Sequence, residues 1–131
     1  MKRVITYKTE ISSSHHLPDT PELCTKKCHN PHGHNYLISI AIAGEINRAG
    51  MIIDYGFIKH IIDTLDHQDL NDYVTPSTAE EIAQYLYEGI RDLFQQDGEM
   101  NSPYHFVLVK VKETSKTAAY YGDESLVSFL E

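Results

Sequence analysis

Residues 24–36, with the sequence CTKKCHNPHGHNY, combine side chains that can bind a metal ion with side chains that can act as nucleophiles. The segment holds both cysteines of the chain and three of its eight histidines. His32 and His34 are separated by Gly33 alone, and residues i and i+2 of a β-strand point to the same face of a sheet. Two imidazoles on one face can share one ion, and zinc suits such ligands. The spacing therefore predicts a zinc site.

A third ligand for this ion has to come from another part of the chain, because a catalytic zinc usually has three protein ligands and one open position. His15 and His16, in the stretch SSSHHLP just past a predicted strand, are the best candidates, and His29 is a weaker one. A structural zinc site would instead be closed by four ligands, and Cys24 and Cys28 could supply the missing ones. The spacing alone leaves both kinds of site open.

Proton transfer or nucleophilic attack is the second kind of chemistry that these residues could support. A nearby zinc ion and the cationic Lys26 and Lys27 would favour the thiolate form of Cys28. A catalytic cysteine also needs a proton-handling partner. The stretch LDHQDLN offers Asp66 and His67, because an aspartate can hold an imidazole in one tautomer. Adjacent residues need not touch, however, and a solvated loop at a helix end often has the same composition.

Glu113 is unusual because it continues an apolar row. Val107, Val109 and Val111 alternate along a predicted strand, and Glu113 follows them on the same face. A single glutamate at the end of such a row usually reaches water. The alternative is that its carboxylate binds a ligand that is cationic or rich in N–H groups.

Hydrophobic periodicity predicts four strands around these residues. Residues 12–33 are rich in serine, proline, histidine, asparagine and glycine, and are expected to form a long loop. Loops of that length in compact domains are usually functional or disordered. Residues 122–131 fit either a helix or further strand. The predicted strands cover residues 3–11, 34–44, 105–113 and 117–121.

Two amphipathic helices are expected between the second strand and the third. Apolar residues at positions i, i+3, i+4 and i+7 predict the first helix over residues 54–65. A capping box of Thr78 and Glu81 begins the second helix, and Gly98 lies past its end. The order ββααββ predicts an α+β fold with both helices on one face of an antiparallel sheet, as one domain over residues 1–131. The outer strands leave open edges that oligomerisation could pair.

The bulk composition excludes some classes of function. The 131 residues carry a formal net charge of −8, which argues against a general nucleic-acid-binding protein. No segment approaches the ~20 apolar residues that span a bilayer, and the N-terminus lacks the pattern of a signal peptide. We therefore expect a cytoplasmic protein without nucleic-acid or membrane partners. In a reducing cytosol, Cys24 and Cys28 are expected to be thiols or ligands rather than a disulfide.

Five motifs resemble the family of 6-pyruvoyl- and 6-carboxy-tetrahydropterin synthases. In chain order they are SSSHHLP, CHNPHGHNY, LDHQDLN, TAEEIA and VKET. Each motif is weak by itself, but five in order, from about residue 5 to residue 121, are specific. The resemblance implies the tunnelling fold, in which ββααββ subunits assemble into barrels with active sites at subunit interfaces. It therefore implies a homo-oligomer, a hexamer formed as a dimer of trimers.

The resemblance also implies roles for individual residues. The family pattern of a histidine, one variable residue and Leu-Pro selects His15 rather than His16 as the third zinc ligand. The implied residues are the zinc ligands His15, His32 and His34, the catalytic residues Cys28, Asp66 and His67, and the substrate-binding residues Glu113, Thr78 and Glu80. Of the last three, Glu113 would grip the 2-amino and ring N–H groups of a pterin.

The spacing between Cys28 and His32 resembles that of the bacterial 6-carboxy-tetrahydropterin synthases, whereas the animal pyruvoyl-forming enzymes have a longer gap. The resemblance implies a zinc-dependent lyase that converts 7,8-dihydroneopterin triphosphate to 6-carboxytetrahydropterin, acetaldehyde and triphosphate, on the path to queuosine. The alternatives are a 6-pyruvoyl-tetrahydropterin synthase of the tetrahydrobiopterin path, a pterin- or purine-binding subunit of the same fold, and a non-catalytic zinc protein. Cys24 is an extra cysteine and is expected to be a loop residue.

Overall fold

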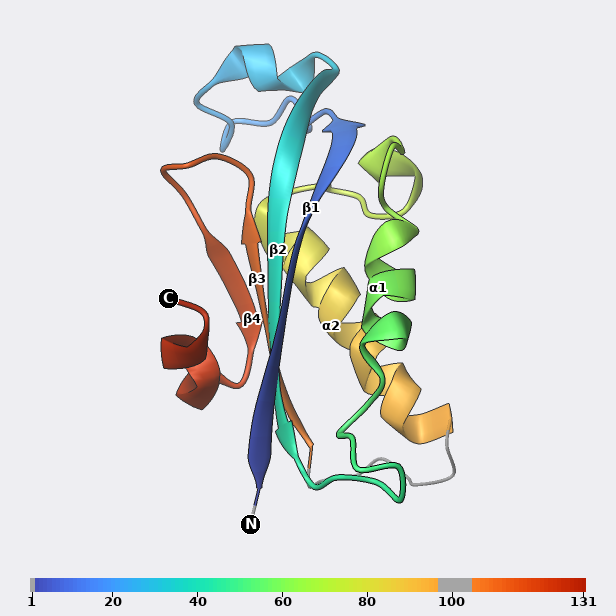
Figure 1. Cartoon of the computed structure of the whole chain (residues 1–131). Coiled ribbons are helices and arrows are strands. Elements are labelled where there is room, and N and C mark those ends of the chain that lie inside the picture. Colours follow the sequence, from blue (N-terminus) through green and yellow to red (C-terminus); the bar gives the residue numbers. More distant parts are fainter. Residues whose placement is uncertain (1, 97–104) are drawn as a thin grey trace.

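Four antiparallel strands form a sheet in the order β1-β2-β3-β4 (Figure 1). The computed structural model describes residues 2–96 and 105–131. The chain order confirms the predicted ββααββ arrangement. The strands and α-helices are β1 (Arg3–His15), β2 (His32–Gly44), α1 (Tyr55–Asp63), α2 (Ala79–Gln96), β3 (Phe106–Lys112) and β4 (Ala119–Gly122), and the 3-10 helices are η1 (Lys26–His29), η2 (Leu70–Asp72) and η3 (Glu124–Phe129).

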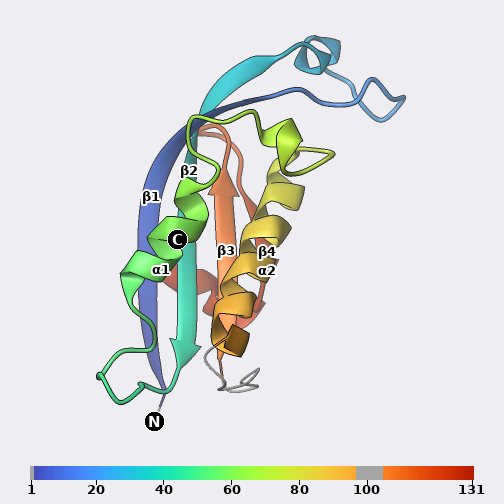
Figure 2. The ribbon, with the colours of Figure 1, turned by 90° about the vertical axis from the view of Figure 1, so that its right-hand side faces the viewer.

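Both α-helices pack on one face of the sheet, as predicted (Figures 1 and 2). Alternate residues of β2 and β3 point toward the helices, because side chains alternate between the two faces of a strand. The helices bury the apolar residues that recur along one side of each. The main core between the two layers includes Ile38, Ile40 and Ile42 of β2, Val107, Val109 and Val111 of β3, Ile58 and Ile62 of α1, and Ile82, Leu86 and Ile90 of α2.

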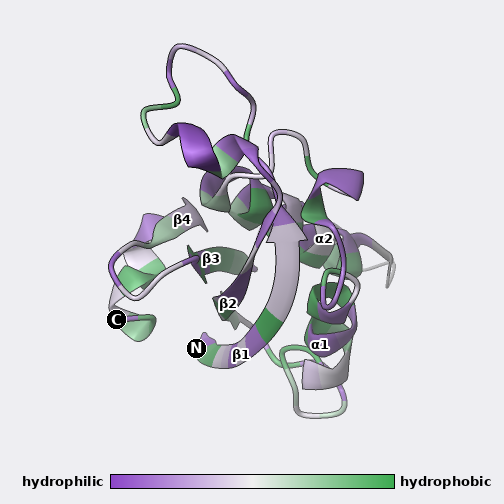
Figure 3. Cartoon of the chain, turned by 90° about the horizontal axis from the view of Figure 1, so that it is seen from above, coloured by the Kyte–Doolittle hydropathy of each residue, from purple (hydrophilic) through white to green (hydrophobic). Residues whose placement is uncertain are grey.

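The other face of the sheet is covered by the segment that follows β4. Residues 122–131, which fitted either helix or strand, contain the 3-10 helix η3, and its place opposite the α-helices is visible from above (Figure 3). Leu126 and Leu130 are buried against the small side chains Ala41 and Ala43 in a second apolar cluster. The Nζ atom of Lys110 donates a hydrogen bond of 2.9 Å to the carbonyl oxygen of Leu130. The sheet therefore has packed side chains on both faces.

β1 is longer than predicted, and the expectation of a loop from residue 12 onward is wrong for residues 12–15. The three serines before His15 pair with β2 down to the pair His15↔His32. On the opposite side of β1, the backbone N–H of Ser14 donates to the carbonyl of Gln68 and that of His67 donates to the carbonyl of Ser12. Backbone pairing on both sides holds this polar stretch as strand, which side-chain hydrophobicity could not reveal.

The long loop narrows to residues 16–31 and contains η1, whereas the start of α2 agrees with the prediction. The backbone N–H of Glu81 donates 3.2 Å to the hydroxyl of Thr78, which is one half of the predicted capping box. The predicted stop at Gly98 lies outside the described residues. Among the helices of the described ranges, none is long and apolar enough to cross a membrane.

Gly122 permits the turn from β4 into η3. Its φ is +127°, and a Cβ added there would collide with the carbonyl oxygen of Val107. Gly50 also has a positive φ, +81°, but a Cβ there would meet nothing within 4 Å.

We expect Gly122→Ala to lower the free energy of unfolding by about 3 kcal/mol and Gly50→Ala by about 1 kcal/mol, because only the first change adds a collision to the backbone strain. Urea denaturation of both variants measures this, and equal losses would contradict the steric argument.

Candidate metal centre

Strand register brings the three predicted zinc ligands together. His15, the last residue of β1, pairs with His32, the first residue of β2, and Ser13 pairs with His34. Directly opposed residues of an antiparallel pair lie on the same face, so all three imidazoles project from one end of the sheet toward a common point. The ring centroid of His15 lies 4.6 Å from that of His32 and 5.2 Å from that of His34.

Backbone carbonyl groups set the orientation of two of these rings. Nδ1 of His15 lies 2.8 Å from the carbonyl oxygen of Ser77, and Nδ1 of His32 lies 2.7 Å from that of Asn30. A carbonyl only accepts hydrogen bonds, so each Nδ1 carries the proton and each Nε2 has a free lone pair. The Nε2 atoms of His15, His32 and His34 are all buried and have no hydrogen-bond partner of standard geometry. Buried imidazole lone pairs that converge, with Nδ1 fixed by a carbonyl, fit a metal ion.

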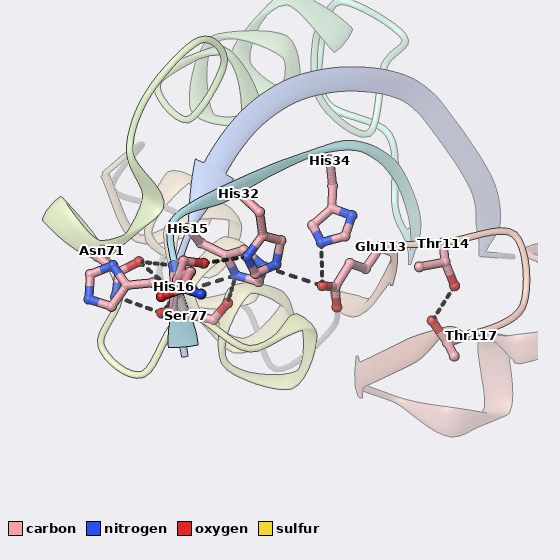
Figure 4. A network of polar contacts seen from close by, with 10 residues as sticks. His15, His16, His32, His34, Asn71, Ser77, Glu113, Thr114 and Thr117 are labelled. Atoms are coloured by element: carbon pink, nitrogen blue, oxygen red, sulfur yellow. Dashed lines mark hydrogen bonds and ion pairs between the residues drawn. The ribbon is translucent and has the colours of Figure 1, made fainter. Parts of the chain in front are cut away.

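Glu113 joins this group from β3. It follows the last residue of the strand on the face of Val111, as the apolar row predicted. Its Oε1 atom lies 2.8 Å from Nε2 of His34 and 3.2 Å from Nε2 of His15 (Figure 4). Within the described ranges, these three histidines and Glu113 are the one group that could hold a metal ion, with ligand atoms all within 4.8 Å of one another. Glu113 therefore does not simply reach water.

The Glu113 carboxylate and burial have opposite effects on the pKa values of the histidines. Burial lowers the pKa of His15, but the Glu113 carboxylate and the Ser77 carbonyl outweigh it, so this pKa lies above its ordinary value. Burial holds the pKa of His34 below its ordinary value despite Glu113. Contact with His15 in turn lowers the pKa of Glu113. Glu113 therefore favours the protonated form of His15, whereas burial favours the neutral form of His34.

Tyr36 and Ser77 support the site and were not predicted to do so. Tyr36 continues the row of His32 and His34, and its ring packs edge-on against His15 and His34. The buried hydroxyl of Ser77 lies 3.0 Å from Oδ1 of Asn71 and 3.2 Å from the backbone carbonyl oxygen of His16, so either can accept its one proton. The i+2 spacing in HGHNY could have identified Tyr36. Nothing in the sequence identifies a carbonyl that orients a ring, because every residue has one.

Asp66 and His67 form the contact that the sequence left open. Nδ1 of His67 lies 3.0 Å from Oδ1 of Asp66, which also accepts a hydrogen bond from the backbone N–H of Ser12. That backbone bond, followed by contact with His67, lowers the pKa of Asp66. His67 adopts a left-handed φ of 58°, and its ring lines an open pocket of about 570 Å³ together with His34. His67 and the cluster residue His34 therefore face the same pocket.

The cysteines lie outside the metal cluster. Cys24 is exposed and Cys28 is half-buried in η1, and both are free thiols. The four-ligand zinc site that would include them is therefore not what the described residues form. Nζ of Lys26 donates a hydrogen bond of 2.7 Å to the carbonyl oxygen of Thr20 and lies 3.4 Å from Oδ1 of Asp19. Its contacts are thus with other residues of the same loop.

The remaining predicted residues occupy the periphery of the cluster. Thr78 directly follows Ser77, whose carbonyl contacts His15, and Glu80 is exposed in the first turn of α2. His16 is adjacent to His15 but points away from the cluster, and its ring lies 6.4 Å from that of His29. His29 contacts the carbonyl of Leu17 instead of the cluster.

Several known proteins resemble this chain in sequence or in structure. A 6-pyruvoyl tetrahydrobiopterin synthase from Drosophila melanogaster is 32% identical over 89% of this chain and 77% of its own length. A putative 6-carboxy-5,6,7,8-tetrahydropterin synthase from Pyrococcus abyssi is 41% identical, but over 52% of this chain and only 41% of its own length. The structure of the 6-pyruvoyl tetrahydropterin synthase of Caenorhabditis elegans superposes with a TM-score of 0.66 at 25% identity, covering 94% of this chain and 96% of that one.

The sequence profile of one enzyme family covers nearly the whole chain. It is the profile described as 6-pyruvoyl tetrahydropterin synthase, and it matches residues 4–124. Apart from Arg3, the first residue of β1, the match includes all the strands named above, both α-helices and every residue of the metal cluster. The chain therefore belongs to the 6-pyruvoyl tetrahydropterin synthase family.

Proposed function

We propose that this protein is a zinc-dependent 6-carboxy-5,6,7,8-tetrahydropterin synthase, which converts 7,8-dihydroneopterin triphosphate and one water molecule to 6-carboxytetrahydropterin, acetaldehyde and triphosphate. The observation that carries the proposal is the convergence of three buried Nε2 atoms, from His15, His32 and His34, in a chain of this family. Two of these rings have the fixed tautomer that a metal ligand needs. Zinc suits the site because it is commonly held by imidazole nitrogens.

The three histidines would hold the zinc, which when bound supplies a Lewis acid that polarises an oxygen of the substrate side chain. Cys28, as a thiolate, would remove a proton from that side chain. His67 would be its partner, because Asp66 contacts Nδ1 and thereby leaves Nε2 to accept or donate a proton. Glu113 would bind the 2-amino and ring N–H groups of the pterin by charge-assisted hydrogen bonds. Thr78, just before α2, and Glu80, in the first turn of α2, would line the same pocket.

A single chain does not bring Cys28 into the metal cluster, so the proposal includes assembly. β1 and β4 are the outer strands of the sheet, and their unpaired backbone groups can bind further strands. We propose a homo-hexamer, a dimer of trimers, in which active sites form where subunits meet. In that assembly, catalytic groups of one chain can face the metal cluster of another.

The spacing of Cys28 from His32 supports the carboxy product, and the archaeal relative bears that name. The Drosophila relative, which matches more of the chain, supports the second candidate, a 6-pyruvoyl-tetrahydropterin synthase that eliminates only triphosphate. Both candidates use the same substrate and release triphosphate. They differ in that only the first also breaks a carbon–carbon bond.

Product analysis separates these candidates. We expect the zinc-loaded protein, incubated with 7,8-dihydroneopterin triphosphate, to release triphosphate and acetaldehyde and to form 6-carboxytetrahydropterin. Mass spectrometry and a coupled acetaldehyde assay measure this. Triphosphate with a pyruvoyl-pterin and no acetaldehyde would favour the second candidate. Zinc-loaded protein that turns over no substrate would contradict both.

Removal of a single imidazole tests the ligand set. We expect His15→Ala to lower the zinc affinity by at least about 100-fold, because even outer-shell partners of a zinc ligand are worth about 10–100-fold. His16→Ala is the matched control, since the neighbouring ring lies outside the cluster, and it should keep the wild-type affinity. Competition with a chromophoric chelator gives both values. Equal losses in the two variants would show that His15 is not a ligand.

The two cysteines provide a second matched pair. Cys28→Ala should lower kcat by about 10²–10⁴-fold, the usual contribution of a positioned acid or base, while its zinc content stays at the wild-type level. Cys24→Ala should retain both activity and zinc. If Cys24→Ala loses the activity instead, the catalytic thiol is Cys24, and if Cys28→Ala loses zinc, the thiol is a ligand.

A further inference from the structure

The position of the Glu113 carboxylate is not explained by pterin binding. One of its oxygens lies within 3.2 Å of two imidazole nitrogens, in the space toward which the free lone pairs of the cluster point (Figure 4). The side chain is only 24% exposed, so it is not a solvated group that meets the histidines by chance. In the described part of the chain, its ion-pair contacts are with His15 and His34.

A carboxylate oxygen in that place has the chemistry of a metal ligand. Zinc accepts aspartate and glutamate oxygens beside imidazole nitrogens, and four protein ligands close its coordination shell. Glu113 offers one ligand atom in a group whose four ligand atoms all lie within 4.8 Å of one another. Because Glu113 directly follows β3, which is paired with β2, the strand register holds it beside the histidines.

We infer that Glu113 is the fourth protein ligand of the metal in the substrate-free protein and that a bound pterin draws it away. This inference rests on the proposed function, in which the same carboxylate pairs with the pterin. Pairing with two N–H groups of a pterin ring engages both carboxylate oxygens, so it competes with the bond to the metal. The metal would then gain an open position only when the ring is bound.

The alternative is that the Glu113 carboxylate only accepts a hydrogen bond from a protonated imidazole and never binds the metal. That role depends only on negative charge near the histidines, whereas ligation also requires a side chain long enough to place an oxygen on the metal. Two variants separate charge from reach. Glu113→Gln removes the charge and keeps the length, and Glu113→Asp keeps the charge and shortens the side chain by one methylene.

A nearby carboxylate that does not touch the cluster supplies the control. Asp69 adds to the negative potential at His15, and its own Oδ1 accepts a hydrogen bond from the backbone N–H of Asn71. Asp69→Asn removes that charge and keeps an oxygen that can accept the same bond. It therefore measures how much a nearby charge alone contributes to metal affinity.

Zinc dissociation constants of the full-length protein test the inference by chelator competition. Ligation predicts that Glu113→Gln and Glu113→Asp both weaken zinc binding by at least about tenfold, and that Asp69→Asn changes it by about twofold or less. Circular dichroism of the metal-free variants checks that each is folded. Wild-type affinity in Glu113→Asp, or an equal loss in Asp69→Asn, would overturn ligation in favour of charge alone.

Cobalt(II) in place of zinc tests the exchange by a second route, because its visible absorption reports the coordination geometry. The probe ligand is 7,8-dihydroneopterin, which lacks the triphosphate leaving group. We expect the wild-type spectrum to change when the probe is added, and Glu113→Gln to differ from the wild type before any probe is added. Identical spectra of the two probe-free proteins would overturn the inference.

Failure of this inference and failure of the proposed function give different results. If wild type and Glu113→Gln bind zinc equally while wild type forms the carboxy-pterin, only the inference about Glu113 is wrong. If wild type binds zinc but turns over no substrate, the proposed function is wrong, and the affinities still decide whether Glu113 is a ligand.

Discussion

The candidate site depends on the register between β1 and β2. Only the pairing of His15 with His32 puts these two imidazoles on one face, with His34 two residues further along it. A shift of one residue would place Gly33 opposite His15 and turn the other two rings to the opposite face of the sheet. The same register sends the isoleucines of β2 into the core beneath the helices. Burial of that apolar row therefore fixes the geometry of the metal ligands.

Segments far from β1 and β2 in the sequence orient the histidines that these two strands bring together. The carbonyl group before α2, at Ser77, orients His15, and the loop before β2 orients His32 through Asn30. Residues 66–69 pair with the outer edge of β1 and thereby hold the Asp66–His67 contact beside the strand end. Backbone groups in ordered segments have little freedom to move, so they set the tautomers and directions of the rings more rigidly than mobile side chains could.

Glu113 introduces negative charge where three imidazoles meet, in a protein that is itself acidic. Its carboxylate favours a proton on His15, whose pKa is raised because Glu113 and the Ser77 carbonyl outweigh the effect of burial. A divalent ion would take the place of the proton, since ligation requires the neutral imidazole. The ligand role that we propose for Glu113 would account for a charged residue at the end of an apolar row.

Hydrophobic periodicity and i, i+2 spacing predicted the order of elements, the helix-covered sheet and the shared face of His32 and His34, because both are local properties. The spacing left His15 and His16 as alternatives, and the family resemblance selected His15. It also marked Glu113 as unusual for its row. It misjudged residues 12–15, where backbone hydrogen bonds on both sides of β1 outweigh the polar composition. The sequence did not show that the cysteines lie outside the cluster and that Glu113 lies inside it, because distances between side chains from different strands and loops depend on register and packing in the folded chain.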